Sequence, residues 1–260
     1  MENDEVKVVN VRKSGASWVS ALIIGVCVVA SCAALAAGLS SFHSVEKHTI
    51  GATGSASVDF ESDLITWSGS FNVHAETSQR AYKLIKKDAE IVKDYLVEHG
   101  MKEGEEFELG SVDISKRTKD IYDANGNWVG NEPDGYDLYQ RVKITSSQID
   151  AVEAISRDIS ALLDEGVEFT SDTPQYYYTE LDSLKLDLIE KATKNARERI
   201  NIIADNSDAQ TGKLVNSNLG VFQITATNSG TGDYSYDGAF DTYSRNKTAT
   251  ITVRLEYELK

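Results

Sequence analysis

The sequence predicts an α+β domain that follows an N-terminal transmembrane helix. Apolar and polar residues alternate over residues 65–75 and again over 249–259, which is the period of a half-buried strand. Over residues 81–96 and 181–203, apolar residues instead recur three or four positions apart, which is the spacing of an amphipathic helix. The chain has 260 residues, of which 41% are hydrophobic, so it is long enough to bury a core of this mixed kind.

An uncharged stretch of 22 residues occupies residues 18–39 and is long enough to cross a bilayer as a helix. Arg12 and Lys13 precede this stretch, and the first acidic residue after it is Glu46. Because basic residues stay on the cytoplasmic side, we expect a single-pass signal anchor in the cell membrane with residues 1–17 in the cytoplasm.

The rest of the chain is then expected in the periplasm or on the cell exterior. Residues 40–49 would form a short polar tether, and residues 50–260 the exported domain. Two other fates of the apolar stretch remain open. It could be cleaved as a signal peptide after the Ala-x-Ala site at 34–36, or it could be lipidated at Cys32.

The charge of the chain argues against nucleic acid as a partner. The formal net charge is −15, and residues 1–48 hold four basic and four acidic groups, so the whole excess of acid lies beyond residue 48. Such a surface repels a phosphate backbone. Both cysteines, Cys27 and Cys32, lie in the apolar stretch, so the exported part has neither a disulfide framework nor a thiolate site.

The exported part begins with six elements in the order strand, helix, strand, strand, helix, strand. Before them comes a short strand near 55–58. The expected ranges of the six are 64–75, 77–99, 107–121, 136–144, 149–162 and 167–178. This is the split β-α-β order of ferredoxin-like units. Turn residues at 123–127, extended by Pro133–Gly135, predict a hairpin between the two middle strands, and Ser147 is the expected N-cap of the second helix.

A third helix and two strands complete the expected domain. The helix covers about residues 180–206 with Thr179 as its cap, and the strands lie near 213–226 and 247–260. We expect this helix and the last strand to supply contacts between subunits.

The sequence offers no clear catalytic, cofactor or metal site, and we expect a non-enzymatic protein. Gly212-Lys213 follows a helix and precedes a strand, with a single glycine, so it is a turn and not a phosphate-binding loop. Asp123, Asn125 and Asn127 resemble the start of a calcium loop, but Trp128 occupies the glycine position. None of the four histidines has metal-ligand spacing with another.

Tyrosines form the candidate interaction surface. Three adjacent tyrosines on a strand cannot all face one core, so at least one is expected to face solvent, a helix or a partner. A long loop at 228–245, rich in Gly, Tyr and Asp, precedes the last strand, and loops of this length are commonly functional or disordered. The six candidates are Tyr176, Tyr177, Tyr178, Tyr234, Tyr236 and Tyr243.

Four sequence patterns occur in the order found in one bacterial family. They are the opening strand at 51–58, a first helix from Ala81 that ends in Leu-x-x-x-Gly at Leu96 and Gly100, the closing helix and turn, and the last strand at 248–253. The closing helix and turn contain Ala192-x-x-x-Ala196-Arg197, Ile203-Ala204 and Gly212–Val215. Over residues 50–260 the chain resembles the SIMPL-domain family of bacterial envelope proteins, which includes the periplasmic immunogenic proteins.

The resemblance implies an α+β fold, assembly into rings or barrels of many copies, no established catalytic residues, and a loose association with envelope and oxidative stress. The chain departs from the family pattern at residues 59–63 and in its acidic, Tyr-rich loops. We therefore expect a membrane-anchored envelope protein that forms a homo-oligomer. The alternatives are an extracytoplasmic binding module that holds a cell-wall, glycan or protein partner with its Tyr-rich loops, and a hydrolase that uses scattered carboxylates.

Overall fold

A computed structural model describes residues 18–42, 48–230 and 235–260, and it describes the backbone alone for residues 19 and 38–42. The chain divides into two compact units, Met1–His48 and Thr49–Lys260. In the first unit, α1 (Trp18–Phe42) is a single helix. Its segment Ser20–Ala37 is long and apolar enough to cross a membrane, a test that a signal sequence near the N-terminus also passes.

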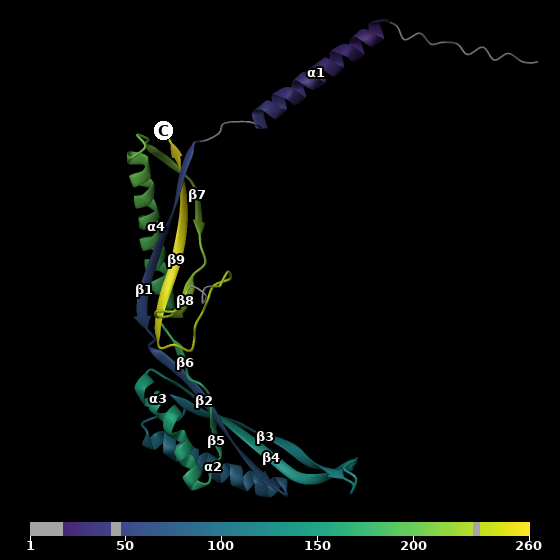
Figure 1. Cartoon of the computed structure of the whole chain (residues 1–260), viewed down its shortest axis with the longest axis vertical. Coiled ribbons are helices and arrows are strands. Elements are labelled where there is room, and N and C mark those ends of the chain that lie inside the picture. Colours follow the sequence, from purple (N-terminus) through teal and green to yellow (C-terminus); the bar gives the residue numbers. More distant parts are fainter. Residues whose placement is uncertain (1–17, 43–47, 231–234) are drawn as a thin grey trace, which may run out of the picture. The chain divides into compact units, whose positions relative to one another are not determined.

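The second unit contains two antiparallel sheets (Figure 1). Sheet A is built from β1 (Thr49–Glu61), β9 (Asn246–Leu259) and β7 (Thr211–Leu219) in that order, and β8 (Gln223–Ala226) also pairs with β9. The last strand, β9, is therefore interior, with β1 on one edge and β7 and β8 on the other. Because both of its edges are paired, β9 has no free edge with which to extend the sheet into a neighbouring molecule.

Helix α4 (Leu181–Asp205) covers one face of sheet A (Figure 1). Its buried stripe packs against the apolar side chains of β1 and β9. The members of the stripe are Leu188, Ala192, Ala196, Ile200 and Ala204. The small residues let the helix approach closely: a Cβ built on Gly54 of β1 would lie 2.2 Å from the amide nitrogen of Ala196 and 2.3 Å from the carbonyl oxygen of Ala192.

The same helix covers part of the free edge of β1. The Asn195 Oδ1 atom accepts the Ser55 N–H at 3.3 Å, and the Arg199 guanidinium donates to the Thr53 carbonyl at 3.2 Å. An edge strand with unpaired backbone groups is a template for pairing with another chain. The side chains of α4 therefore block the middle of this edge.

Sheet B has the strand order β3-β4-β2-β5, and β6 also pairs with β2. Its strands are β2 (Leu64–Ala75), β3 (Phe107–Tyr122), β4 (Trp128–Ser146), β5 (Phe169–Ser171) and β6 (Gln175–Tyr177). Its helices are α2 (Ser78–Glu98), α3 (Ile149–Asp158) and the 3-10 helix η1 (Ile159–Glu165). This strand order confirms the predicted split β-α-β unit.

The helices pack on one face of sheet B because alternate residues of β2 and β4 are apolar. Trp67 and Phe71 of β2 and Val142 and Ile144 of β4 are buried there against Ile85 and other residues of the helices. Residues between them, such as Ser68, point to the opposite face, since successive side chains of a strand alternate.

Two expected strands each proved to be two. The stretch 167–178 forms β5 and β6, which pair with different parts of β2 on either side of Pro174. The stretch 213–226 forms β7 and β8, which pair with different parts of β9. By contrast, one expected strand was too short: β1 extends well beyond 55–58 because it pairs with β9 over its full length.

The expected helix caps and the expected extension of the hairpin turn were wrong. The expected caps Ser147 and Thr179 are replaced by Gln148 and Glu180, neither of which makes a side-chain cap bond. The Thr179 hydroxyl instead donates to Asp63 at 2.6 Å. The segment Pro133–Gly135 is not part of the turn: it lies in β4, opposite a register shift between Arg117 and Thr118.

The two sheets meet where three chain segments cross. Residues 62–63 join β1 to β2: the Ser62 N–H donates to the Arg245 carbonyl at 2.9 Å, and the Asp63 N–H to the Tyr177 carbonyl at 3.0 Å. Lys247, which is 2% exposed, donates from its Nζ atom to the Tyr176 carbonyl. Burial lowers the pKa of Lys247.

Arg245 adds ion pairs at this crossing. Its guanidinium contacts Glu61 of β1 at 2.7 Å and Asp150 of α3 at 2.5 Å. One side chain at the end of the 228–245 loop thus links a strand of sheet A to a helix of sheet B.

The close contact between β1 and α4 makes Gly54 a sensitive position. We predict that Gly54→Val destabilises the domain by about 1–3 kcal/mol, because the new side chain must push the α4 backbone away. Chemical denaturation followed by circular dichroism measures this loss. Gly230→Val is the control, since no described residue lies within 4 Å of a Cβ at that position. Equal stability of the two variants would contradict the close contact.

Candidate functional site

The three adjacent tyrosines lie in three different surroundings. Tyr176 packs against the core of sheet B, and its hydroxyl donates to Glu153 of α3 at 2.9 Å. The Tyr177 hydroxyl donates to the Gln175 side chain at 2.8 Å. The Tyr178 ring lies 4.9 Å from the Phe60 ring of β1. The strand therefore distributes these side chains between the two sheets and an open hollow, as expected for neighbours that cannot share one core.

The tyrosines of the 228–245 loop are also dispersed. Tyr234 lies outside the described residues. Tyr236 is 96% exposed and borders a hollow of about 500 Å³ beside Val221. Tyr243 borders a different hollow, which it shares with Tyr177. Of the six candidates, the structure brings Tyr177 and Tyr243 together at one site.

That site, which we call the Arg141 hollow, has a volume of about 650 Å³. Residues from β2, β4, β6 and two loops contribute to it. They are Thr66, Trp67, Ser68, Arg141, Lys143, Asp172, Thr173, Gln175, Tyr177 and Tyr243. Arg141 and Lys143 alternate along β4 with the buried residues Val142 and Ile144, so their side chains point away from the helices of sheet B.

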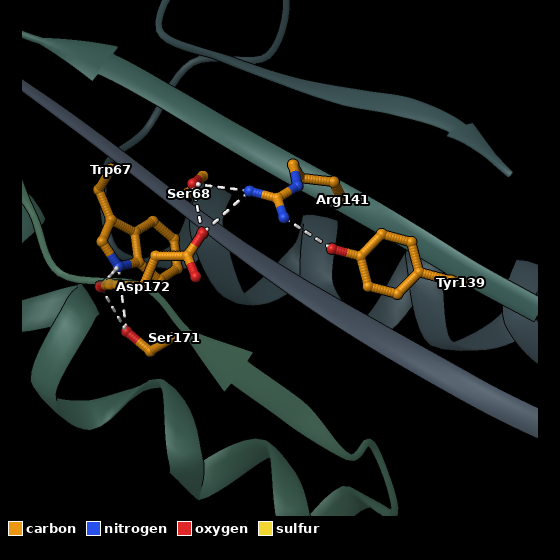
Figure 2. A network of polar contacts seen from close by, with 6 residues as sticks. All are labelled: Trp67, Ser68, Tyr139, Arg141, Ser171 and Asp172. Atoms are coloured by element: carbon orange, nitrogen blue, oxygen red, sulfur yellow. Dashed lines mark hydrogen bonds and ion pairs between the residues drawn. The ribbon is translucent and has the colours of Figure 1, made fainter. Parts of the chain in front are cut away.

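A polar network fixes the position of Arg141 (Figure 2). Its Nη1 atom donates to Asp172 Oδ2 at 3.0 Å and to Ser68 Oγ at 3.2 Å, and its Nη2 atom donates to the Tyr139 hydroxyl at 2.9 Å. The Ser68 hydroxyl donates to Asp172 at 2.6 Å. The hydrogen bond to Tyr139, together with the nearby Asp172, raises the pKa of Arg141, so this side chain remains a cation.

The Asp172 backbone is held from the other side of the network. The Trp67 indole N–H lies 3.1 Å from the Asp172 carbonyl oxygen and 3.0 Å from the Ser171 hydroxyl, which accept it (Figure 2). Trp67 itself is buried and stacks on Phe169. The loop that carries Asp172 is therefore attached to the core through its main chain, while its carboxylate stays about half exposed.

The side chains that line the Arg141 hollow include more cations than anions, although the protein as a whole is acidic. Arg141 and Lys143 contribute two cations, and Asp172 contributes one anion. In the described part of the chain, no carboxylate lies within ion-pair distance of the Lys143 ammonium, whose cross-strand neighbour on β3 is Glu108. The Arg141 guanidinium is paired with Asp172. The arrangement provides fixed donors, hydroxyl and amide groups and two tyrosines, which suits the binding of a polar, anionic molecule.

A second hollow, of about 760 Å³, contains an ion-pair cluster that sequence reasoning missed. His74 Nδ1 lies 2.7 Å from Asp137 Oδ1, and Arg117 contacts the same oxygen at 3.8 Å. His74 and Asp137 are cross-strand partners of β2 and β4. The sequence shows both as polar residues of their strands, but their pairing depends on the register. Asp88 of α2 borders the same hollow and is buried, which raises its pKa.

The distal part of the β3–β4 hairpin is a second feature that sequence reasoning missed. Every residue from 113 to 133 is exposed except Gly130. Beyond the pairing of Ala75 with Tyr136, the hairpin continues with its own two strands alone, so this outer part of the ribbon is not buried against the domain. Tyr122 and Trp128 are cross-strand partners near its end and are each about 60% exposed. The turn residues at 123–127 located the hairpin correctly, but the returning strand begins at Trp128 and not at the expected residue 136.

Comparison with protein families assigns the chain to one family. A family model described as "SIMPL: Protein of unknown function (DUF541)" matches residues 50–257. The protein belongs to this family, and the resemblance inferred from the sequence is confirmed. A comparison with curated proteins found no match.

The buried Asp88 gives a prediction for pH dependence. A carboxyl group whose pKa is raised on folding destabilises the folded state when the group is charged. This loss of stability is fully present above the pKa of the folded state. It disappears as the pH falls to the pKa of the unfolded state, about 3.9. We therefore expect Asp88→Asn to be more stable than the natural protein at pH 7, with the difference shrinking as pH approaches 4. Denaturation at several pH values measures it. The exposed Asp94 of the same helix is the control, and a difference that grows at low pH would refute the assignment.

Proposed function

We propose that this member of the SIMPL family is a membrane-anchored, non-enzymatic protein of the bacterial cell envelope whose exported domain assembles into a homo-oligomeric ring or barrel. α1 serves as the anchor, and Arg12 and Lys13 keep the N-terminus in the cytoplasm. The domain at 49–260 then lies in the periplasm or outside the cell, where a link to envelope or oxidative stress fits the family resemblance.

The observation that carries this proposal is the exposed ribbon at residues 113–133, whose outer part, from Arg117 onward, pairs with no third strand of the described residues. A two-stranded hairpin is marginally stable in water unless it packs against something else. This ribbon exposes Ile121, Tyr122, Trp128 and Val129, although a soluble surface seldom gathers large apolar side chains at one place. A contact with another copy of the chain would cover them and order the ribbon.

The edge of sheet A at β7 supplies a second surface for assembly. Leu214, Val215 and Leu219 of this strand are about half exposed, and α4 packs on β1 and β9 and makes few contacts with β7. The outward side of α4 adds Leu186 and Ile202, which are also exposed.

The ribbon belongs to sheet B and the β7 edge to sheet A, so the two surfaces differ. Contact between different surfaces of identical subunits is heterologous, and a heterologous contact generates a ring when the rotation closes. We infer that the ribbon of one copy contacts the β7 edge of the next, an arrangement that forms a ring and not a two-fold dimer. The net charge of −15 opposes assembly at low salt, and added salt screens this repulsion.

The ribbon gives the sharpest test of assembly. We expect the double variant Tyr122→Ser, Trp128→Ser to reduce the mass of the full-length protein in mild detergent, measured by light scattering, from a large particle to one or a few copies. Its circular dichroism should not change, because both residues lie outside the two buried cores.

Tyr82→Ser is the matched control, since Tyr82 is 54% exposed on α2. It should leave the particle intact. A natural protein that is monomeric at every concentration and salt level would refute the proposed assembly.

A second candidate function is an extracytoplasmic binding module for a cell-wall, glycan or protein partner. The observation that favours it is the meeting of Tyr177 and Tyr243 with Arg141 and Gln175 in one hollow. Aromatic rings with fixed polar neighbours are typical of ligand sites.

Sedimentation with purified peptidoglycan sacculi tests this candidate. We expect Tyr243→Ala to lower the bound fraction several-fold, because Tyr243 borders the Arg141 hollow and is 64% exposed. Tyr236→Ala is the control, because Tyr236 belongs to the other hollow. An equal loss in both variants would show that the Arg141 hollow is not the contact.

A further inference from the structure

We propose that the Arg141 hollow binds an acidic sugar, with a carboxylate or phosphate of the ligand taking the place that the Asp172 carboxylate occupies beside Arg141. This inference rests on the second candidate function and names the ligand class of that site. Four features support it. They are the two neighbouring cations of β4, the Asp172 carboxylate that a ligand can displace, the hydroxyl and amide groups around them, and the two tyrosines that border the hollow.

The cations of the hollow can hold an anion together. Arg141 and Lys143 are two residues apart on one face of β4, which separates their Cα atoms by roughly 7 Å at the rise of a strand. A guanidinium has five N–H donors, and the network uses three of those of Arg141 within the described residues. Within the described residues, the Lys143 ammonium has no ion-pair partner. Both cations therefore retain donors for a carboxylate or phosphate.

Asp172 stands where such a ligand would bind. Its carboxylate contacts Arg141 at 3.0 Å, and the two side chains are 44% and 52% exposed. An ion pair this exposed is weak and exchanges readily. Trp67 holds the Asp172 carbonyl, whereas the carboxylate is held by the exposed Arg141 and Ser68 side chains. The carboxylate can therefore exchange these contacts for solvent while the loop stays attached to the core. Asp172 is thus a weak internal competitor for the anion site.

The surroundings of the cations suit a sugar better than a bare anion. Thr66, Ser68 and Thr173 contribute hydroxyl groups, and Gln175 contributes an amide. Tyr177 is held by its hydrogen bond to Gln175, so binding costs little side-chain freedom at this ring. Sugar rings combine hydroxyl groups with apolar C–H faces, which match polar groups beside aromatic rings.

Saturation-transfer NMR on the full-length protein in mild detergent tests the proposal with three probes. Sodium D-glucuronate carries both ring and charge, D-glucose has the ring alone, and acetate has the charge alone. We expect D-glucuronate to bind about tenfold more tightly than either of the others, because it alone uses the cations and the rim together. Added salt should weaken it.

Two substitutions give opposite expected effects. Arg141→Met should weaken glucuronate binding about tenfold, since it removes the principal cation. Asp172→Asn should strengthen binding several-fold, because it removes the internal competitor. Lys213→Met, on exposed β7 of sheet A, is the control and should have no effect. Circular dichroism of each variant checks that the fold is retained.

Three results would overturn the proposal. They are equal binding of glucose and glucuronate, weaker binding in Asp172→Asn, and no saturation transfer from the protein to glucuronate. Equal binding of the two sugars would mean that the hollow binds sugars without a preference for an acidic group. If the protein binds sacculi but not glucuronate, the binding module recognises a different class of ligand. Light scattering reports assembly separately, so its outcome does not decide this site.

Discussion

The crossing between the two sheets is the constraint on which the rest of the exported domain depends. β1 and β2 are separated by residues 62–63 alone, so one chain segment passes almost directly from sheet A into sheet B. Two further segments cross beside it, and main-chain hydrogen bonds from Ser62 and Asp63 tie the three together. Lys247 is buried at this point, where its ammonium satisfies the Tyr176 carbonyl. An amine that stays buried needs such a partner, which explains a lysine in an otherwise apolar face of β9.

The crossing also creates the candidate site. β6 lies beside β2 immediately after the crossing, and the Tyr176 N–H donates to the Thr242 carbonyl of the loop before β9. This bond places Tyr243 next to the strand that carries Tyr177, although the two residues are 66 positions apart in the sequence. The Arg141 hollow therefore forms on the open face of sheet B, and the loop before β9 of sheet A contributes Tyr243 to it. Its polar network is exposed and contributes little to stability.

Protection against unwanted pairing differs among the sheet edges. The middle of the β1 edge is covered by Asn195 and Arg199 of α4. The β3 edge carries Lys116, Arg117 and Lys119 and two register shifts in its outer half, which are features that oppose pairing. β7 has register shifts in its first half but exposes apolar residues. The domain thus closes some edges and leaves an apolar one, which agrees with the proposed assembly.

The sequence by itself determined the class of the fold, the helical stripes, most strand positions and the family. These follow from periodicity, which depends on local geometry: period two in 65–75 and spacing of three or four in 181–203 each fit one kind of element. Tertiary structure decided the interior place of β9, the separate surroundings of Tyr176, Tyr177 and Tyr178, and the exposure of the 113–133 ribbon. It also decided the pairing of Arg141 with Asp172 and of His74 with Asp137. Such features depend on strand order and register, and many registers are compatible with the same alternation of polar and apolar residues until the sheets are formed.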